Sequence, residues 1–308
     1  MKKRIGLIDF GSNTFHIIIA DMTKERWEIL FHQRDYVFLA QAGISTIADE
    51  ALDRGMEAVA EFHDICHQYE VDEIIAVGTA ALRSAKNSSA FTTVIREQFD
   101  IRTQIIDGQR EADLIYKGMI LACPSHKQDA LFMDIGGGST EFILTDHENI
   151  VFQQSYPIGL GVLKNKIPFS DPILPEEINR LNQFLDQKAD SLIKQLRKHP
   201  PRTLIGGSGT FDVLAEALTK ETFESQNCSV IAPAQVRQFM TPRIQTTLAE
   251  RLQDEYIPDE RIYLIIHAFL LILWVLDRTS VESVAFSKFA LKEGLLQECF
   301  EDWVGFRS

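Results

Sequence analysis

Two segments of the chain, 125 residues apart, repeat one pattern without a gap. Residues 7–21 read LIDFGSNTFHIIIAD and residues 132–146 read FMDIGGGSTEFILTD, so that Asp9 aligns with Asp134. Each copy has a short apolar strand, a turn rich in glycine and hydroxyl residues, and a second apolar strand, which is the pattern of a β-hairpin. The repeat predicts two related lobes that begin with the same hairpin.

The rest of the chain alternates between apolar strands and amphipathic helices, which indicates an α/β protein with mixed sheets. Strands are expected at residues 27–39, 73–77, 101–106, 149–155, 203–205 and 281–286, and helices at 51–69, 91–99, 110–122, 176–198, 262–276 and from 289. We expect one lobe at residues 1–122 and a second at 123–288. The last helix, 289–308, is expected to pack back on the first lobe.

The acidic balance of the chain restricts its partners. A net charge of −13 argues against broad capture of nucleic acid or of an anionic membrane. A polyanionic substrate would need local help from backbone N–H groups, a few basic side chains and a divalent metal. The apolar run at 262–276 has fifteen residues, fewer than the ~20 that span a bilayer, and we interpret it as a helix buried on all sides.

The four cysteines are widely scattered and form no CxxC pair, which favours neither a zinc cluster nor a disulfide framework. This usage fits a reducing cytoplasm, and we expect a cytoplasmic protein. The N-terminal MKKRIGLIDF is basic, but Asp9 interrupts its apolar run after a few residues. We interpret it as a strand and not as a signal peptide.

Four loops rich in glycine, serine and threonine follow expected strands, where ligands gather in open α/β sheets. They are Gly11–Thr14, Gly78–Thr79, Gly136–Thr140 and Gly206–Thr210. Glycine lets the main chain approach an oxyanion closely, and successive N–H groups form an anion-binding nest. The four loops therefore predict phosphate binding.

Acidic residues stand beside these loops. Asp9 and Asp134 each end a strand just before a loop, and a carboxylate next to phosphate calls for a bridging divalent cation. The alternative is that each aspartate caps its own loop. Glu141 lies on the strand that leaves the second loop, opposite in direction to Phe142. It is expected to ligate metal or orient water, or else to be solvated.

Several residues have two interpretations when taken alone. Glu111 suits the first turn of a helix through the helix dipole, and Arg83 is either a surface residue or a bidentate phosphate ligand. The segment HDICH, from His63 to His67, resembles the zinc-protease HExxH motif, but Asp64 replaces the glutamate and no third ligand is evident. We interpret it as a solvated helix face. His267, in the apolar run, is expected to be a satisfied core residue.

The motifs LIDFGSNT, AVGTAALRSAKN, IDGQREADLIYKG, FMDIGGGSTEF, GGSGT and ALKEGLL occur in the order typical of one family. Over nearly its whole length the chain resembles the exopolyphosphatase and guanosine pentaphosphate phosphatase family, within the actin, sugar-kinase and heat-shock-ATPase superfamily. GQREA and DIGGGSTE are specific to it, whereas GGSGT alone is not. The resemblance implies two ribonuclease-H-like, actin-like lobes with the active site in the cleft that they form.

The resemblance also implies roles for single residues. Glu111 matches the glutamate that activates the attacking water, and Asp134 and Glu141 match carboxylates that hold Mg²⁺ or Mn²⁺ or position that water. The phosphate-contacting segments match Ser12, Asn13, Thr79, Arg83, Gly136, Gly137, Gly138, Ser139, Gly207, Ser208, Gly209 and Thr210. His16 stands where the second hairpin has Glu141. We therefore expect the second hairpin to hold metal and water and the first to grip the substrate.

The expected reaction is hydrolysis of the terminal phosphate of inorganic polyphosphate. Guanosine pentaphosphate hydrolysis, ATP-dependent kinase or ATPase activity, and phosphate sensing without catalysis are the alternatives. Two departures from the family bear on substrate handling: Lys292-Glu293-Gly294 replaces a common Arg-Glu-Gly, and Lys288 stands where an acidic residue is common. The chain ends at 308, without the C-terminal helical domains that contribute to long-chain handling and dimerisation, so processivity and a homodimer stay open.

Overall fold

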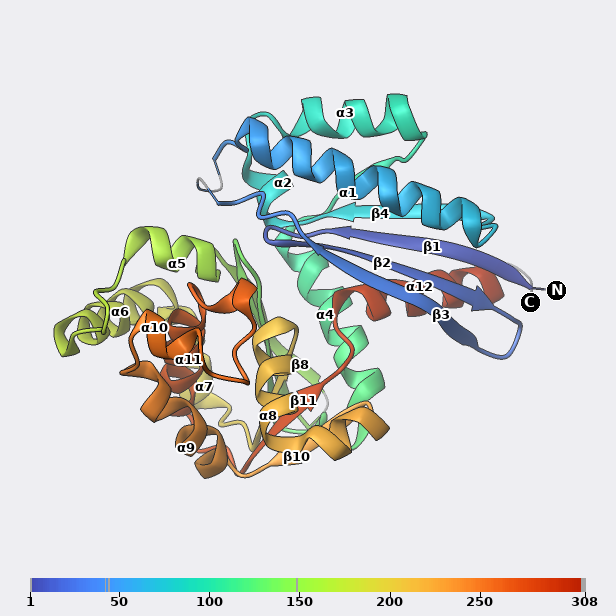
Figure 1. The fold of residues 1–308 in the computed structure, drawn as a ribbon. Helices are drawn as coiled ribbons and strands as arrows, with labels where there is room; N and C mark the ends of the chain where they lie inside the picture. Colours follow the sequence, from blue (N-terminus) through green and yellow to red (C-terminus); the bar gives the residue numbers. More distant parts are fainter. Residues whose placement is uncertain (1, 42, 44, 148, 306–308) are drawn as a thin grey trace. The chain divides into compact units, whose positions relative to one another are not determined.

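The computed structural model describes residues 2–41, 43, 45–147 and 149–305. The chain divides into two compact units, each built on one mixed sheet (Figure 1). Unit 1 contains Met1–Gly118 and Leu291–Ser308, and unit 2 contains Met119–Ala290.

Unit 1 has a five-stranded sheet in the order β3-β2-β1-β4-β5. The strands are β1 (Lys3–Phe10), β2 (Thr14–Met22), β3 (Trp27–Tyr36), β4 (Glu73–Gly78) and β5 (Thr103–Ile105). The first three form an antiparallel meander, and β4 and β5 run parallel to β1. The helices are α1 (Asp49–Gln68), α2 (Ala80–Ser84), α3 (Ser88–Phe99), α4 (Gly108–Ala122) and α12 (Leu291–Gly305).

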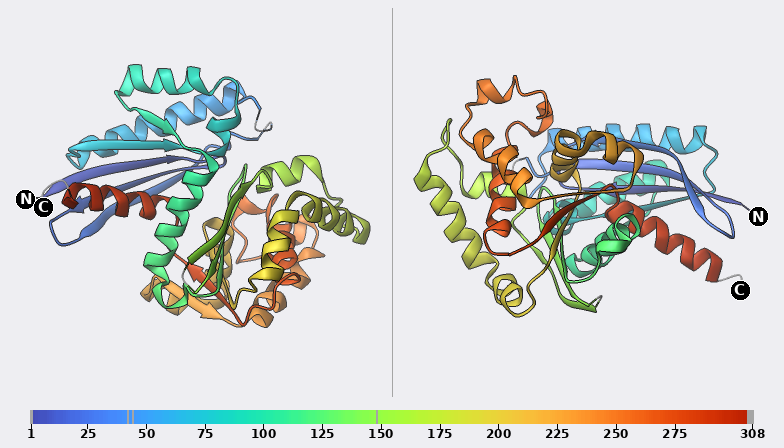
Figure 2. Two further views of the ribbon diagram at one scale, coloured as in Figure 1. Left: turned by 180° about the vertical axis from the view of Figure 1, so that it is seen from behind. Right: turned by 90° about the horizontal axis from the view of Figure 1, so that it is seen from below.

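Helices cover both faces of this sheet: α1 and α3 lie on one face and α12 on the other (Figures 1 and 2). The helical period of α1 buries Val59, Phe62 and Cys66 against the sheet. On α12, a Cβ atom at Gly294 would overlap the carbonyl oxygen of Leu114 on α4. The glycine of the Lys-Glu-Gly motif therefore permits close packing of these two helices.

Unit 2 has a six-stranded sheet in the order β10-β11-β9-β6-β7-β8. The strands are β6 (Ala130–Ile135), β7 (Thr140–Asp146), β8 (Asn149–Tyr156), β9 (Thr203–Gly207), β10 (Cys228–Ile231) and β11 (Ser283–Ser287). The helices are α5 (Leu160–Lys166), α6 (Pro175–Lys188), α7 (Asp190–Lys198), α8 (Gly209–Ser225), α9 (Pro233–Ile244), α10 (Leu248–Arg251) and α11 (Ile265–Leu276), with 3₁₀ turns η1 (Pro124–His126) and η2 (Asp259–Arg261).

The predicted repeat is confirmed in the topology. Strands β6, β7 and β8 form the same antiparallel meander as β1, β2 and β3, and β9 pairs parallel to β6 as β4 does to β1. Even the register agrees, because Asp9 lies opposite His16 and Asp134 lies opposite Glu141. The predicted class, α/β with mixed sheets flanked by helices, is confirmed.

The expected helix at 176–198 is two helices, which meet at Ala189. The Tyr156 hydroxyl accepts a hydrogen bond of 3.1 Å from the backbone N–H of Leu192 in the first turn of α7. A tyrosine of β8 therefore caps the start of the second helix, and the sequence of the helix alone does not contain this signal. Strand β10 and helices α2, α5, α9 and α10 were not predicted.

Helix α11 occupies most of the apolar run and has eleven of its twelve residues buried, as predicted. Among the described residues, no helix combines the length and the apolar character needed to cross a membrane.

The expectation that the cysteines form no disulfide was wrong for one pair. Cys123 and Cys228 form a disulfide, with their Cα atoms 5.3 Å apart and a sequence separation of 105. Cys123 directly follows α4, and Cys228 begins β10, which the sequence did not predict. Their proximity is a result of the fold of unit 2 and leaves no local pattern.

Candidate phosphate-binding and catalytic site

The first hairpin loop, Gly11–Thr14, joins β1 to β2. A Cβ atom on Gly11 would lie 2.6 Å from the carbonyl oxygen of Thr14, so this tight turn requires glycine. The carbonyls of Ser12 and Asn13 accept hydrogen bonds of 2.9 to 3.0 Å from the backbone of residues 37, 38 and 40. The N–H groups of Ser12 and Asn13 have no partner in the described part of the chain, so they are available to an anion.

The Arg83 guanidinium links α2 to α4. Its Nη1 donates to the carbonyl oxygen of Ile106 and to Oε2 of Glu111, each at 2.8 Å. Glu111 lies in the first turn of α4 with only 6 % of its surface exposed. Burial raises the pKa of Glu111, and the nearby Arg83 charge opposes this shift only in part.

The predicted residues of unit 1 lie at one edge of its sheet. Strands β1 and β4 are parallel neighbours with Phe10 opposite Gly78, so the first hairpin loop and Thr79 leave the sheet side by side. The Thr79 hydroxyl is buried and donates to the Phe10 carbonyl oxygen at 3.5 Å. Ile106, which accepts from Arg83, also donates its N–H to the Gly78 carbonyl oxygen. The fold thus brings loop, arginine and glutamate to the same edge.

The second hairpin loop, Gly136–Thr140, presents its polar groups in one direction. The carbonyls of Gly136, Gly137 and Gly138 accept hydrogen bonds of 2.9 to 3.3 Å from the backbone N–H groups of residues 159–161, at the start of α5. Within the described residues, the N–H groups of Gly137, Gly138 and Ser139 have no partner. This sorting of donors from acceptors is what a phosphate-binding nest requires.

Gly159 shapes this loop, although the sequence analysis did not single it out. A Cβ atom there would lie 2.5 Å from backbone atoms of Gly137, Gly138 and Ser139, so no larger residue fits without moving the loop. The available signal was weak: two glycines, at 159 and 161, soon after a strand.

The last of the four glycine-rich loops, Gly206–Thr210, leads from β9 into α8. Ser208 has φ of 65°, and its hydroxyl donates to Oδ2 of Asp134 at 2.8 Å. Thr210 is 1 % exposed, and its hydroxyl has no partner in the described part of the chain. Strand β9 pairs with β6 so that Gly207 lies opposite Asp134. The second hairpin loop and the start of α8 therefore form one surface of free N–H groups, suited to an anion.

Asp134 and Glu141 form the pair of carboxylates expected to hold a metal. They lie directly opposite each other on β6 and β7, with exposures of 6 % and 1 %, so their side chains share one face. The Ser155 hydroxyl donates to Oε1 of Glu141 at 2.6 Å. Two buried carboxylates on one face of neighbouring strands are suited to a divalent, oxygen-preferring cation. In the first hairpin the same register pairs Asp9 with His16. This pair has less negative charge than the pair of Asp134 and Glu141.

Arg261 is a candidate that sequence reasoning missed. Its guanidinium lies over Gly209, where a Cβ atom would overlap Nη2 of the arginine. The side chain is half-buried and has no hydrogen bond or ion pair with the described residues. A guanidinium with free donors at the start of α8 is suited to bind phosphate. No motif links it to the GGSGT loop, because 51 residues separate Arg261 from Thr210.

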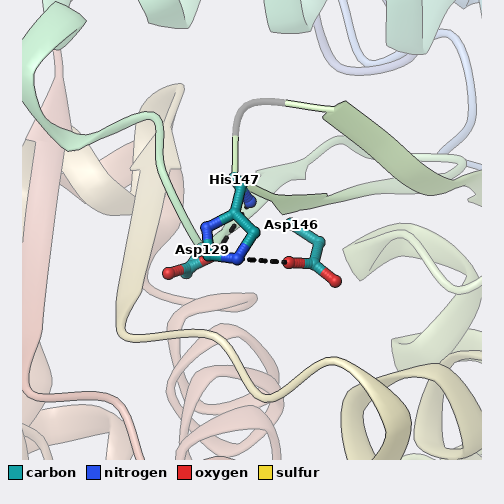
Figure 3. A group of neighbouring side chains, drawn as sticks. All are labelled: Asp129, Asp146 and His147. Atoms are coloured by element: carbon teal, nitrogen blue, oxygen red, sulfur yellow. Dashed lines mark hydrogen bonds and ion pairs between the residues drawn. The ribbon is translucent and has the colours of Figure 1, made fainter.

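A group of potential metal ligands that the sequence did not predict lies elsewhere in unit 2. Asp129, Asp146 and His147 have ligand atoms within 4.8 Å of one another (Figure 3). Asp129 precedes β6 and Asp146 ends β7, so the group is at the opposite end of this hairpin from the phosphate loop. The His147 side chain is 87 % exposed and about 3.8 Å from either carboxylate. We interpret the group as polar contacts at the surface and not as a metal site.

His267 is confirmed as a core residue. One ring nitrogen bonds to the Ile167 carbonyl oxygen at 2.9 Å, and the ring stacks on Phe169 with centroids 3.9 Å apart. Burial lowers the pKa of His267 to about 4, so the ring is neutral near pH 7.

Two sheets share a five-stranded arrangement, and each has a glycine loop with free N–H groups at the same end of its strands, an arrangement that suits a phosphate-binding protein of two similar units. Comparison with known proteins specifies the class. The model of the Ppx/GppA phosphatase family matches residues 18–302, and the chain belongs to this family. Its membership makes the chain an enzyme, a phosphoric anhydride hydrolase.

Individual relatives agree with the family assignment. A Haemophilus influenzae protein, provisionally named an exopolyphosphatase, is 28 % identical over 305 residues, which cover 96 % of this chain and 90 % of that protein. The crystal structure of a Cytophaga hutchinsonii exopolyphosphatase is similar with a TM-score of 0.93 and 32 % identity, covering 97 % and 98 % of the two chains. A Ppx/GppA family structure from Aquifex aeolicus, 21 % identical, has a TM-score of 0.81 over 98 % and 99 % of the chains and supports the fold. The actin-like, two-domain character of this fold confirms the resemblance.

Proposed function

We propose that this protein is an exopolyphosphatase that releases the terminal phosphate of inorganic polyphosphate by attack of water. The observation that carries the proposal is the buried Glu111 carboxylate, which has a raised pKa and is held by Arg83 at 2.8 Å. A carboxylate of this kind is suited to accept a proton from water. The names of the Haemophilus and Cytophaga relatives support the same substrate.

In this proposal, most of the catalysis comes from positioning the substrate and the water and from neutralising the phosphate charge, as is general for phosphoryl transfer. The free N–H groups of the two hairpin loops and of the α8 start bind phosphate oxygens. Arg83 and Arg261 add guanidinium donors. Glu111 orients a water molecule in line with the terminal phosphorus and takes its proton.

We also propose that Mg²⁺ or Mn²⁺ is the cofactor, with Asp134 and Glu141 as its protein ligands. The pair fits such an ion, because both are buried carboxylates on one face of the sheet. When bound, the ion would neutralise charge on the phosphate oxygens. Ser208 and Ser155 hold the two carboxylates in place through their hydroxyls.

The decisive experiment is phosphate release from polyphosphate and from guanosine pentaphosphate, with and without Mg²⁺, by wild type and Glu111→Gln. We expect Mg²⁺-dependent release by wild type and a loss of about 10²-fold or more in the variant. Glu97→Gln, an exposed glutamate on α3, is the matched control and should keep full activity.

The other outcomes separate the alternatives. Unimpaired release by Glu111→Gln would remove Glu111 from the reaction. Polyphosphate and guanosine pentaphosphate present the same terminal group, so both must be compared. Faster release from guanosine pentaphosphate would assign that nucleotide as the substrate. Robust ATP turnover with no release from either substrate would support a kinase or ATPase.

A cytoplasmic location remains part of the proposal. The Cys123–Cys228 disulfide weighs against a strongly reducing compartment, where such bonds are rare. Cell fractionation followed by thiol alkylation of the native protein tests location and disulfide together.

A further inference from the structure

Two histidines on α1 converge one helical turn apart. The Nε2 atoms of His63 and His67 are 3.1 Å apart, and their rings meet edge to face with centroids 4.4 Å apart. The His67 residue is exposed and the His63 side chain is 25 % exposed. Without a metal, this geometry requires the Nε2–H of one ring to donate a hydrogen bond to the Nε2 of the other.

We propose that His63 and His67 chelate a divalent transition metal such as Zn²⁺, Ni²⁺ or Cu²⁺ through their Nε2 atoms. Metal–imidazole bonds of about 2.0 to 2.1 Å, at angles between octahedral and tetrahedral, place two ligand nitrogens roughly 2.8 to 3.4 Å apart. The observed 3.1 Å lies inside this range. Residues i and i+4 face the same side of a helix, so one ion reaches both rings with little change in α1.

The surroundings of His63 support this use of Nε2. The Asp64 Oδ1 atom lies 4.0 Å from Nδ1 of His63, on the other side of the ring. A carboxylate facing Nδ1 favours a proton there and leaves the Nε2 lone pair for a metal. The ring also packs against Phe99, with centroids 5.3 Å apart, which limits its motion. Water would complete the coordination on the exposed side.

The chemistry of this pair differs from that of Asp134 and Glu141. Neutral imidazoles suit the transition metals, whereas Mg²⁺ prefers oxygen ligands. The pair also lies apart from the phosphate loop of unit 1. Tyr69, after the last turn of α1, accepts a hydrogen bond from Arg4 near the start of β1, and the loop follows the other end of β1, roughly 25 Å along the strand. The proposal of this metal site and the proposal of polyphosphate hydrolysis can therefore be tested, and refuted, separately.

Calorimetric titration of the tag-free full chain with Ni²⁺, in excess Mg²⁺, tests the proposal. We expect one Ni²⁺ equivalent per chain in wild type and loss of this equivalent in both His63→Ala and His67→Ala. Alanine is favourable in a helix, so both variants should fold. The His147→Ala variant, which removes the exposed histidine beside Asp129 and Asp146, is the matched control and should still bind.

A second measurement identifies the ligand atoms. On addition of Zn²⁺, the imidazole NMR signals of His63 and His67 should shift together, with the Nε2 resonances moving most, while those of His147 stay in place. Binding that persists in both α1 variants, or that is lost in His147→Ala, would overturn the proposal. Phosphate release in the presence of Mg²⁺ should be unchanged in all three variants.

Discussion

In the proposed reaction, Glu111 and Arg83 meet two opposing demands on the base. Proton transfer from water at neutral pH is helped by a carboxylate with a raised pKa, and burial provides this shift. The same burial would leave an ionised carboxylate without water to stabilise its charge. The Arg83 guanidinium, at 2.8 Å, supplies the opposite charge. A bond from the same nitrogen to the Ile106 carbonyl oxygen fixes the arginine.

The first prediction concerns the acid side of the pH–activity profile. Below its raised pKa Glu111 is protonated and accepts no proton, so activity should rise as the pH increases through that pKa. The midpoint should lie above the ordinary glutamate value of about 4.3. The pH dependence of kcat/KM for polyphosphate measures it, and a midpoint at or below that value would contradict the assigned role.

The second prediction concerns Arg261, whose donors face the start of α8. Arg261→Ala should raise KM for polyphosphate about tenfold or more, the worth of a hydrogen bond to a charged group. The effect on kcat should be smaller. Arg237→Ala, which removes an exposed arginine paired with Asp277, serves as the control. Equal kinetics for the two variants would exclude Arg261 from phosphate binding.

At the scale of elements, the proposed phosphate-binding nest of unit 2 lies within residues 130–166, which run from β6 to α5. Strand β6 ends at the loop, and the start of α5 occupies the loop carbonyls. The loop conformation therefore depends on a helix that follows it in sequence, with β7 and β8 between them. Gly159 is the contact point of the two parts.

Gly159→Ala supplies the third prediction. The added methyl group has no room against the loop backbone, so either the loop or α5 must shift. We expect a large loss of phosphate release, with destabilisation of about 1–3 kcal/mol, typical of overpacking. Steady-state kinetics and thermal unfolding measure both effects. Gly305→Ala, where the methyl group meets nothing within 4 Å, should behave as wild type.

Features that depend on residues close in sequence could be predicted, and features that depend on residues far apart in sequence could not. The repeated hairpins, their mixed sheets and the Asp134–Glu141 pair could be predicted, because alternation and register are local properties. Gly159 and Arg261 could not, because each acts on a loop about 20 to 50 residues away. The break between the two helices at Ala189 could not be predicted either, because the second helix is capped by Tyr156, which is distant in sequence.

Across the whole molecule, a net charge of −13 opposes the approach of a polyanion. Recognition of such a substrate must therefore depend on local donors, and we propose the free N–H groups and the guanidinium groups of Arg83 and Arg261 for this role. Five strands of the two sheets follow the same order, and unit 2 adds β10 at one edge. Unit 2 has an additional covalent link, the Cys123–Cys228 disulfide.

The fourth prediction concerns that link. A disulfide that closes a loop of 105 residues restricts the unfolded chain strongly, and its removal should lower the free energy of unfolding by about 2–5 kcal/mol. Denaturant unfolding of wild type with and without a dithiol reductant measures the effect. The Cys123→Ser/Cys228→Ser double variant should have the free energy of unfolding of reduced wild type, and the reductant should not change it. Cys299→Ser should keep the full response, and a wild type insensitive to reductant would contradict the prediction.

The engaged carbonyls of Gly136, Gly137 and Gly138 have a consequence for selectivity. Because α5 already holds all three, the peptide planes of this loop cannot turn to offer oxygen atoms to a ligand. As the proposed phosphate site, the loop would suit any tetrahedral oxyanion and would have little means to distinguish phosphate from vanadate, tungstate or sulfate. Discrimination must therefore come from groups that contact the rest of the substrate, and variants that change substrate preference should be sought outside this loop.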